Sequence, residues 1–337
     1  KDSCNQKSNQ QNLGVIKSSN LCSEIIEYSD DKEYACCTLA SISLSSFIEN
    51  GAYNFEKLKK ITKLITKALN IIIDDNNYPV KETKISNFKH RPLGIGVQGL
   101  ADTFIKLKYP FESEKAKKLN IQIFETMYYG ALESSMELAQ KYGKYSSYEG
   151  SPISNNLLQY DLWNVTPTNL WNWDELKSKI KKYGVRNSLL IALMPTASTS
   201  TILGNTECFE PITTNLYVRR TLAGEFIVIN SYLMKDLIAK GLWSSDLKDK
   251  MMLNDGSIQN IDIIPKDLKE LYKTAWEIKN KSLIDMSADR GAYVCQSQSL
   301  NLFYDNSSYN KVSSALFYAW KKGLKTGVYY TRTQPKL

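Results

Sequence analysis

Apolar residues recur at the spacing of one helix face in four stretches of the chain. The first stretch predicts a helix over 54–74. The second predicts a longer helix that begins after an N-cap at Ser113 and ends at Gly143. The core-facing residues expected in the first helix are Phe55, Leu58, Ile61, Leu64, Ile65, Leu69 and Ile72.

The third and fourth stretches predict shorter helices in the second half of the chain. One begins at Asn172 or Asp174 and ends at Gly184. The other is expected to be capped by Asp267 and to end near Gly291. The apolar residues on these helices indicate core packing.

Strands are predicted between the helices. The run 188–194 is almost continuously apolar, which is typical of a strand covered on both faces, and 300–304 and 326–330 look similar. Strands that alternate with long helices favour an α/β fold with mainly parallel pairing. The segment 215–262 reads as a loop-rich excursion, and no linker divides the chain.

Composition agrees with a globular protein: 42% of the 337 residues are apolar and 23% are charged. No apolar run is long enough to span a membrane, and no secretory signal is recognisable. The stretch 1–12 is polar and begins without Met, so we expect a piece of a longer protein. A cytoplasmic location fits these features.

The net charge of 43 − 35 = +8 raises the question of nucleic-acid binding. The lysines are scattered on predicted helix faces without clustered stacking aromatics, so a polymer-binding surface is disfavoured. A small anionic substrate fits the charge equally well. The single histidine, His90, and the absence of C-x-x-C argue against a zinc site and against Ser-His or Cys-His catalysis.

Asn20, Cys22 and Glu24 form the first group of residues that could carry chemistry. On an extended backbone, side chains two positions apart point to the same side, so an amide, a thiol and a carboxylate would line one edge. A carboxylate can accept a proton and a thiol can act as a nucleophile or hydrogen-atom donor. On spacing alone, three ordinary residues on a half-exposed strand are the favoured interpretation.

The stretch Gly94 to Gly99 matches the pattern G-x-G-x-x-G. A dinucleotide site needs a strand directly before this pattern and an acidic residue about 20 residues later. The preceding residues 87–92 do not read as a buried strand, and Asp102 follows too early. We therefore expect a helix start or tight helix packing here.

The stretch 194–201 is rich in hydroxyls and follows the apolar run 188–194. A strand that turns into a helix exposes unpaired N–H groups, where a phosphate can bind. A plain Ser/Thr-rich helix cap fits the residues equally well.

Two pairs of adjacent residues are less informative. Cys36 and Cys37 could both be small buried residues. Tyr329 and Tyr330 end a predicted strand, where neighbouring side chains point to opposite faces, so one would face inward and one outward.

Taken in order, these segments resemble the catalytic large subunit of class I ribonucleotide reductase, in particular the eukaryotic type. The resemblance covers almost the whole chain. It rests on Asp2 to Asn5, Ser8 to Leu13, Ser19 to Cys22, Leu39 to Ser41, His90 to Asp102, Pro110 to Glu112, Tyr148 to Pro152, Trp163 to Pro167, Arg186 to Ser188, Met194 to Thr199 and Gly323 to Tyr330.

The resemblance implies that the chain is the C-terminal part of a ten-stranded α/β barrel, with a central finger loop that carries the catalytic cysteine. Cys22 would form a thiyl radical that removes the ribose 3′ hydrogen. Glu24 would take the proton of the 3′-hydroxyl, and Asn20 would hold the ribose hydroxyls. Cys37 would belong to the cysteine pair that completes the reduction. Tyr329 and Tyr330 would relay the radical. The residues implied in substrate binding are Ser19, Asn20, Glu24, Pro195, Thr196, Ala197, Ser198 and Thr199.

The same resemblance implies the reduction of ribonucleoside diphosphates to deoxyribonucleoside diphosphates for DNA precursor supply. Partners would be a metal-containing small subunit that supplies the radical, a second large subunit, and thioredoxin or glutaredoxin as reductant. This chain itself would bind no metal. The region that binds ATP and dNTP effectors and the C-terminal cysteine tail would lie outside the chain, so the fragment is expected to be inactive by itself.

Three departures from the family pattern stand out. Thr38 occupies a position where Asn is usual, and Cys36 adds a thiol beside Cys37, which leaves the redox-active member open. Cys295 stands where Asp is usual. A non-catalytic scaffold, a nicotinamide dehydrogenase and a glycyl-radical reductase are the alternatives, and the retained Cys22, Glu24 and tyrosine pair favour the class I enzyme.

Overall fold

Five parallel chain segments that hydrogen-bond side by side form the centre of the fold. The computed structural model describes residues 2–334. The segments follow the order β1 (Leu39–Ser43), β4 (Gly94–Gln98), the run 189–193, the run 296–304 with β7 (Asn301–Tyr304), and β8 (Tyr330–Thr333). Every pairing in this array is parallel, as expected for an α/β fold. Among residues 2–334 the array does not close into a barrel.

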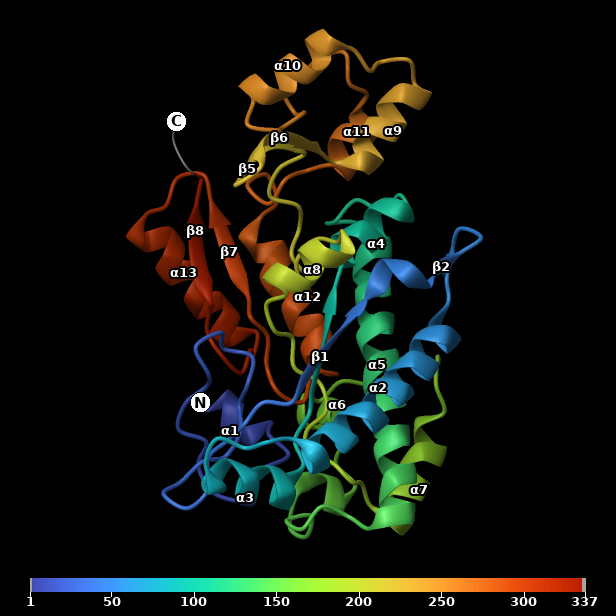
Figure 1. The fold of residues 1–337 in the computed structure, drawn as a ribbon, viewed down its shortest axis with the longest axis vertical. Helices are drawn as coiled ribbons and strands as arrows, with labels where there is room; N and C mark the ends of the chain where they lie inside the picture. The colour runs from blue at the N-terminus through green and yellow to red at the C-terminus, as the bar shows by residue number, and fades with distance from the viewer. Residues whose placement is uncertain (1, 335–337) are drawn as a thin grey trace.

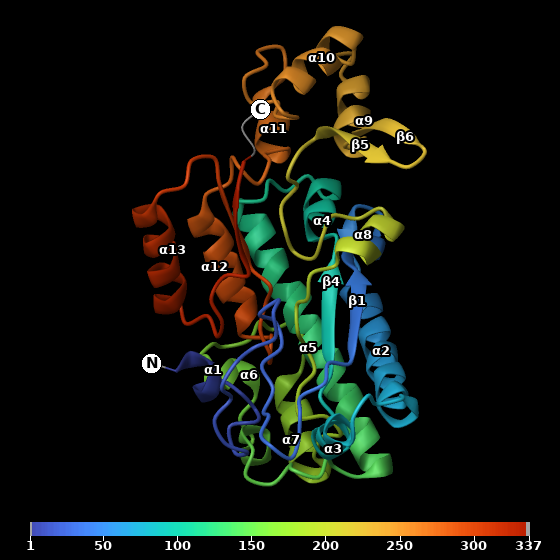
Figure 2. The same ribbon diagram turned by 60° about the vertical axis from the view of Figure 1, so that its left-hand side comes forward.

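Helices cover the array, with α2 packed along the longer α5 beside β1 and β4 (Figures 1 and 2). The larger helices are α2 (Phe55–Asp75), α3 (Lys81–His90), α5 (Glu114–Tyr142), α7 (Trp173–Tyr183), α12 (Asn280–Gly291) and α13 (Tyr309–Lys321). Shorter elements are α1 (Ser3–Gln6), η1 (Leu44–Phe47), β2 (Ile48–Glu49), β3 (Ala52–Tyr53), α4 (Leu100–Lys106), η2 (Pro152–Asn155), α6 (Gln159–Leu162) and α8 (Ala197–Leu203). The strands and the inward faces of the helices share one hydrophobic core.

The segment 215–262, expected to be loop-rich, is instead largely regular. It contains the hairpin of β5 (Leu216–Thr221) and β6 (Gly224–Ile229), followed by α9 (Ser231–Ala239) and α10 (Ser245–Leu253). Together with α11 (Lys266–Leu271) these elements form a lobe at the top of Figure 1 with its own hydrophobic core. Short elements separated by glycines hid this regularity in the sequence.

The first three predicted helices are confirmed. The Ser113 side chain accepts a hydrogen bond from the backbone N–H of Ala116, and Asn172, not Asp174, caps the third helix. Two of the expected core positions in α2 are wrong, because Leu64 is 61% exposed and Ile72 is 48% exposed.

The fourth predicted helix is wrong as a single element. The structure has α11 and α12 in its place, separated by a turn, and Asp267 lies inside the first turn of α11 after Pro265. Ala275 lies in the connection, where its backbone N–H bonds to Ile212 O at 2.7 Å. The helical spacing of apolar residues continues through this connection, but the tertiary contact interrupts the helix itself.

The glycine-rich stretch 94–99 is a strand and not mainly a helix start. Gly94 and Gly96 lie in β4, between β1 and the run 189–193, where neighbours approach very closely. A Cβ on Gly94 would lie 2.5 Å from Leu39 Cδ2, and one on Gly96 would lie 2.5 Å from Met194 Sδ. Only Gly99, with φ of 76°, begins a helix, as predicted. The absence of side chains at Gly94 and Gly96 thus allows the neighbouring strands to pack closely.

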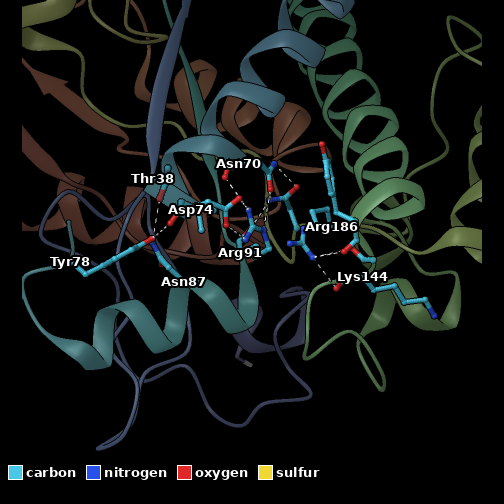
Figure 3. A network of polar contacts seen from close by, with 12 residues as sticks. Thr38, Asn70, Asp74, Tyr78, Asn87, Arg91, Lys144 and Arg186 are labelled. Atoms are coloured by element: carbon cyan, nitrogen blue, oxygen red, sulfur yellow. Dashed lines mark hydrogen bonds and ion pairs between the residues drawn. The ribbon is translucent and has the colours of Figure 1, made fainter. Parts of the chain in front are cut away.

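A buried polar network ties α2 and α5 to the end of α3 (Figure 3). Arg91, only 3% exposed, donates to both carboxylate oxygens of Asp74 at 2.7 and 2.9 Å. Arg186 Nη1 donates to the carbonyls of Tyr142, Gly143 and Lys144 at the end of α5. Both guanidinium groups bond residues at helix ends, so we assign the network to stability.

Asn187 is the centre of this network, and its replacement by Ala should lower the free energy of unfolding by about 3 kcal/mol. Its side chain bonds Asn70, Arg91 O and Ser135 at 2.8 to 3.1 Å, and these buried partners would lose their hydrogen bonds. Urea unfolding checks the effect. The exposed Asn76 at the end of α2 gives a control, and equal stability of the two alanine variants would contradict the assignment.

Candidate active site

The segment around Cys22 folds as a tight turn and not as the predicted extended strand. Asn20 O accepts a hydrogen bond from Ser23 N at 3.1 Å, and Asn20 N donates to Ile25 O at 3.2 Å. Ser23 takes a positive φ of 70°. The Asn20 amide oxygen accepts from Ile25 N at 3.1 Å and so braces the turn. Asn20, Cys22 and Glu24 therefore lie within one turn that is closed by hydrogen bonds between Asn20 and Ile25.

Ser299 fixes the turn from the neighbouring strand run 296–304. Its hydroxyl lies 2.6 Å from Cys22 O and 3.1 Å from Glu24 Oε2. Ser297 N donates to Glu24 O at 2.8 Å, and Glu24 is only 2% exposed. Ser299 thus bonds both the Glu24 carboxylate and the main chain of Cys22. Sequence reasoning missed Ser299, because nothing local distinguishes one serine of this run from another.

The rings of Tyr329 and Tyr330 lie against each other in a tilted arrangement and do not point to opposite faces as predicted. Their ring centroids lie 4.0 Å apart with a 39° angle between the planes. Hydrogen bonding to the Cys22 thiol and then to Tyr330 raises the pKa of Tyr329 above its ordinary value. The thiol and both phenols therefore form one contiguous series. The error arose because the strand begins only at Tyr330, so Tyr329 does not follow strand alternation.

Cys37 and Cys36 both lie near the buried carboxyl group of Glu27. Although Cys37 is exposed, desolvation by surrounding atoms raises its pKa to about 12, with further contributions from Glu27 and then Glu24. Desolvation and Glu27 also raise the pKa of Cys36, but Glu24 has no part in that shift. Cys37 is therefore the member of the pair on the side of Glu24.

Glu27 is a second residue that sequence reasoning missed. It is 6% exposed, and burial raises its pKa to about 8. Gln296 Nε2 donates to its Oε1 at 3.0 Å, while no described residue bonds its Oε2. The only sequence signal was its position five residues after Cys22.

The hydroxyl-rich stretch after the run 188–194 turns into α8, as predicted. Thr196 is buried, and its Oγ1 accepts from Cys208 N at 2.8 Å. Pro195 is half-buried, and Ala197, Ser198 and Thr199 are exposed. Burial raises the pKa of Cys208, and the charge of Glu210 raises it further.

Comparison with known proteins agrees with this geometry. The family model described as "Ribonucleotide reductase, barrel domain" matches residues 1–330. The chain belongs to the ribonucleotide reductase family.

Relatives in this family are similar over nearly the whole chain. The ribonucleoside-diphosphate reductase large chain of Schizosaccharomyces pombe is 61% identical over 99% of this chain and 41% of its own length. The large subunits of Plasmodium falciparum and Danio rerio are 61% and 58% identical, each with 42% of its length covered. The chain therefore spans about two fifths of the curated relatives that it matches.

A solved structure of the same family has a similar fold. The class Id ribonucleotide reductase alpha subunit of Actinobacillus ureae matches with a TM-score of 0.79 at 26% sequence identity. The match covers 99% of this chain and 57% of that chain.

Cys295, an unexplained departure from the ribonucleotide reductase pattern, has a structural role. It is 3% exposed, and its Sγ accepts hydrogen bonds from Leu190 N at 3.0 Å and Ile191 N at 3.1 Å. The thiol thereby holds the run 188–194. His90 is also structural, since it is buried with Nδ1 2.6 Å from Ser147 Oγ.

Across residues 2–334, no group of three or more His, Cys, Asp or Glu side chains is arranged to hold a metal ion. In the same range, every helix is too short or too polar to cross a membrane.

Replacing Glu27 with Gln should speed alkylation of Cys37 by iodoacetamide about threefold between pH 8.5 and 10. The charge that develops on Glu27 above pH 8 raises the Cys37 pKa, so a neutral amide lowers this pKa and increases the thiolate fraction. Peptide mass spectrometry measures the rate. Glu149→Gln, at a side chain that is 81% exposed, is the matched control, and equal rates in both variants would contradict the prediction.

Proposed function

We propose that this chain is part of the catalytic barrel of a ribonucleoside-diphosphate reductase large subunit. The parent protein reduces ribonucleoside diphosphates to deoxyribonucleoside diphosphates through a thiyl radical on Cys22. The observation that carries the proposal is the contact series from Cys22 to Tyr329 and Tyr330, with the Glu24 carboxylate bonded to the same Ser299 hydroxyl that bonds Cys22 O. The names of the relatives support the same substrate class.

The radical step moves a hydrogen atom from Cys22 to an oxidised Tyr329. Tyr330 first loses an electron to the oxidant from the small subunit, together with its phenolic proton, and then regains a hydrogen atom from Tyr329. The oxidised Tyr329 takes the hydrogen of the Cys22 thiol, which restores its phenol and leaves a thiyl radical. The two rings, with centroids 4.0 Å apart, support direct transfer between them.

The thiyl radical then removes the ribose 3′ hydrogen, and Glu24 accepts the proton of the 3′-hydroxyl. The 2′-hydroxyl leaves as water after protonation. Two electrons come from Cys37 and a second cysteine of the parent protein, which join in a disulfide. Cys22 finally returns its hydrogen to C3′. The exposed Cys37 near Glu24 supports this division of roles.

Substrate would be held by the turn at Cys22 and by the loop before α8. The Asn20 amide oxygen is used within the turn, which leaves Nδ2 for a ribose hydroxyl beside Ser19 and Glu24. The exposed backbone and hydroxyls of Ala197 to Thr199, after Pro195 and Thr196, would take the diphosphate.

The remaining expectations concern the parent protein. Five parallel segments are half of a ten-stranded barrel, with the turn at Cys22 as the finger tip beside Ser299. The partners would be a metal-containing small subunit and a second large subunit, with ATP and dNTP effectors bound outside this chain. Thioredoxin or glutaredoxin would re-reduce the site in the cytoplasm.

The test is an assay of the purified full-length protein with its small subunit and a dithiol reductant. We expect deoxyribonucleoside diphosphate to form from the ribonucleotide only when both subunits are present. Absence of deoxynucleotide with a radical-loaded small subunit would refute the proposed function.

A further inference from the structure

Glu210 connects the loop that follows α8 to the strand that carries the tyrosine pair. It is 7% exposed, and its Oε1 accepts a hydrogen bond from Asn301 Nδ2 at 2.7 Å. The other end of the same amide, Asn301 Oδ1, accepts from Tyr330 N at 3.0 Å. A single buried amide therefore links the Glu210 carboxyl group to the main chain of Tyr330.

Arg332 places a positive charge beside the same tyrosine. Its guanidinium carbon lies 5.8 Å from the centre of the Tyr330 ring and 6.0 Å from that of Phe303. Arg332 and Glu210 line one cavity of about 400 Å³. Burial raises the pKa of Glu210, and the positive charge of Arg332 is the largest influence that lowers it.

We propose that Glu210 is a positioning residue for the tyrosine pair: it fixes the Tyr330 main chain through Asn301, and its negative charge offsets Arg332 beside the Tyr330 ring. This inference rests on the proposed radical function. A positive charge near a phenol makes removal of an electron harder, so an uncompensated Arg332 slows the relay.

The surroundings of Glu210 make its charge sensitive to pH near neutrality. Burial raises its pKa to about 7, Arg332 lowers it and Glu207 raises it. The titratable and charged groups that line the two cavities beside Glu210 are Glu207, Tyr217, Arg219, Arg332 and, on the opposite side, Arg290. As pH rises through 7, Glu210 becomes charged and the relay is expected to quicken.

The test uses the full-length enzyme with its small subunit and the variants Glu210→Gln, Arg332→Gln and the double replacement. Gln keeps an oxygen that accepts from Asn301, so Glu210→Gln removes mainly the charge. We expect the turnover of Glu210→Gln at pH 8 to be about tenfold lower than that of the wild type, with unchanged KM. The increase in turnover between pH 6 and 8 should also be smaller in this variant than in the wild type. Arg332→Gln and the double variant should retain turnover and show the same smaller rise.

The inference would be overturned if Glu210→Gln had the turnover and the pH profile of the wild type. It would also be overturned if the double variant were as slow as Glu210→Gln. An unchanged pH profile in Arg332→Gln would overturn it independently, even if Glu210→Gln failed to fold. Inactivity of the wild-type enzyme would instead refute the proposed function, so the two failures are distinguishable.

Discussion

Replacing Cys22 with Ser is expected to lower deoxynucleotide formation by the full-length enzyme at least about 10³-fold. An alcohol O–H bond is stronger than a thiol S–H bond or a phenol O–H bond, so oxidised Tyr329 cannot draw a hydrogen atom from serine. The serine hydroxyl is similar in size to the thiol, and the turn is held by backbone bonds and Ser299. Substrate binding should therefore remain close to that of the wild type.

Cys4→Ser is the matched control, because it makes the same chemical change at a half-buried cysteine outside the site. We expect Cys4→Ser to keep turnover within about twofold of the wild type. Turnover by steady-state assay and substrate affinity by equilibrium binding separate the two effects. Undiminished turnover in Cys22→Ser would remove Cys22 from the chemistry.

Replacing Tyr329 with Phe is expected to have a similarly large effect, at least about 10³-fold on turnover. The ring of Tyr329 lies against that of Tyr330, and Tyr329 interacts with the Cys22 thiol. The hydroxyl of Tyr329 is the only group that phenylalanine lacks. Without this hydroxyl, no hydrogen atom can pass from the thiol to Tyr330. Substrate should still bind, since the ring remains.

Tyr304→Phe provides the control for Tyr329→Phe. Tyr304 lies on β7 beside β8, and its buried hydroxyl has no hydrogen-bond partner in the described part of the chain. Loss of that hydroxyl should leave turnover unchanged and stability equal or slightly higher. Normal turnover in Tyr329→Phe would place the relay elsewhere.

Helix ends were predicted well where capping chemistry is local. Ser113 and Asn172 could be recognised because each side chain bonds a backbone N–H only three residues ahead. The strand at Gly94 and Gly96 was missed because it forms by pairing with β1 and with the run 189–193, which are distant in sequence. Local periodicity cannot report such contacts.

In the candidate site, too, some residues could be predicted from the sequence, whereas the geometry that depends on tertiary contacts could not. Family resemblance pointed to Cys22, Glu24 and the tyrosine pair, but spacing gave the wrong geometry for both motifs. The turn at Cys22 depends on Ser23 adopting a positive φ and on Ser299 reaching across from another strand. Glu27 and Glu210 could not be found in the sequence, because their raised pKa values come from tertiary burial.

The central claim is that Cys22 removes the hydrogen on C3′ of the ribose. The most direct measurement is a competition between unlabelled substrate and substrate deuterated at C3′, with the isotope ratio of the deoxynucleotide read by mass spectrometry at low conversion. We expect product depleted in deuterium relative to the substrate mixture, whereas deuterium at C5′ gives no depletion. An unchanged ratio for the C3′-labelled substrate would contradict the claim.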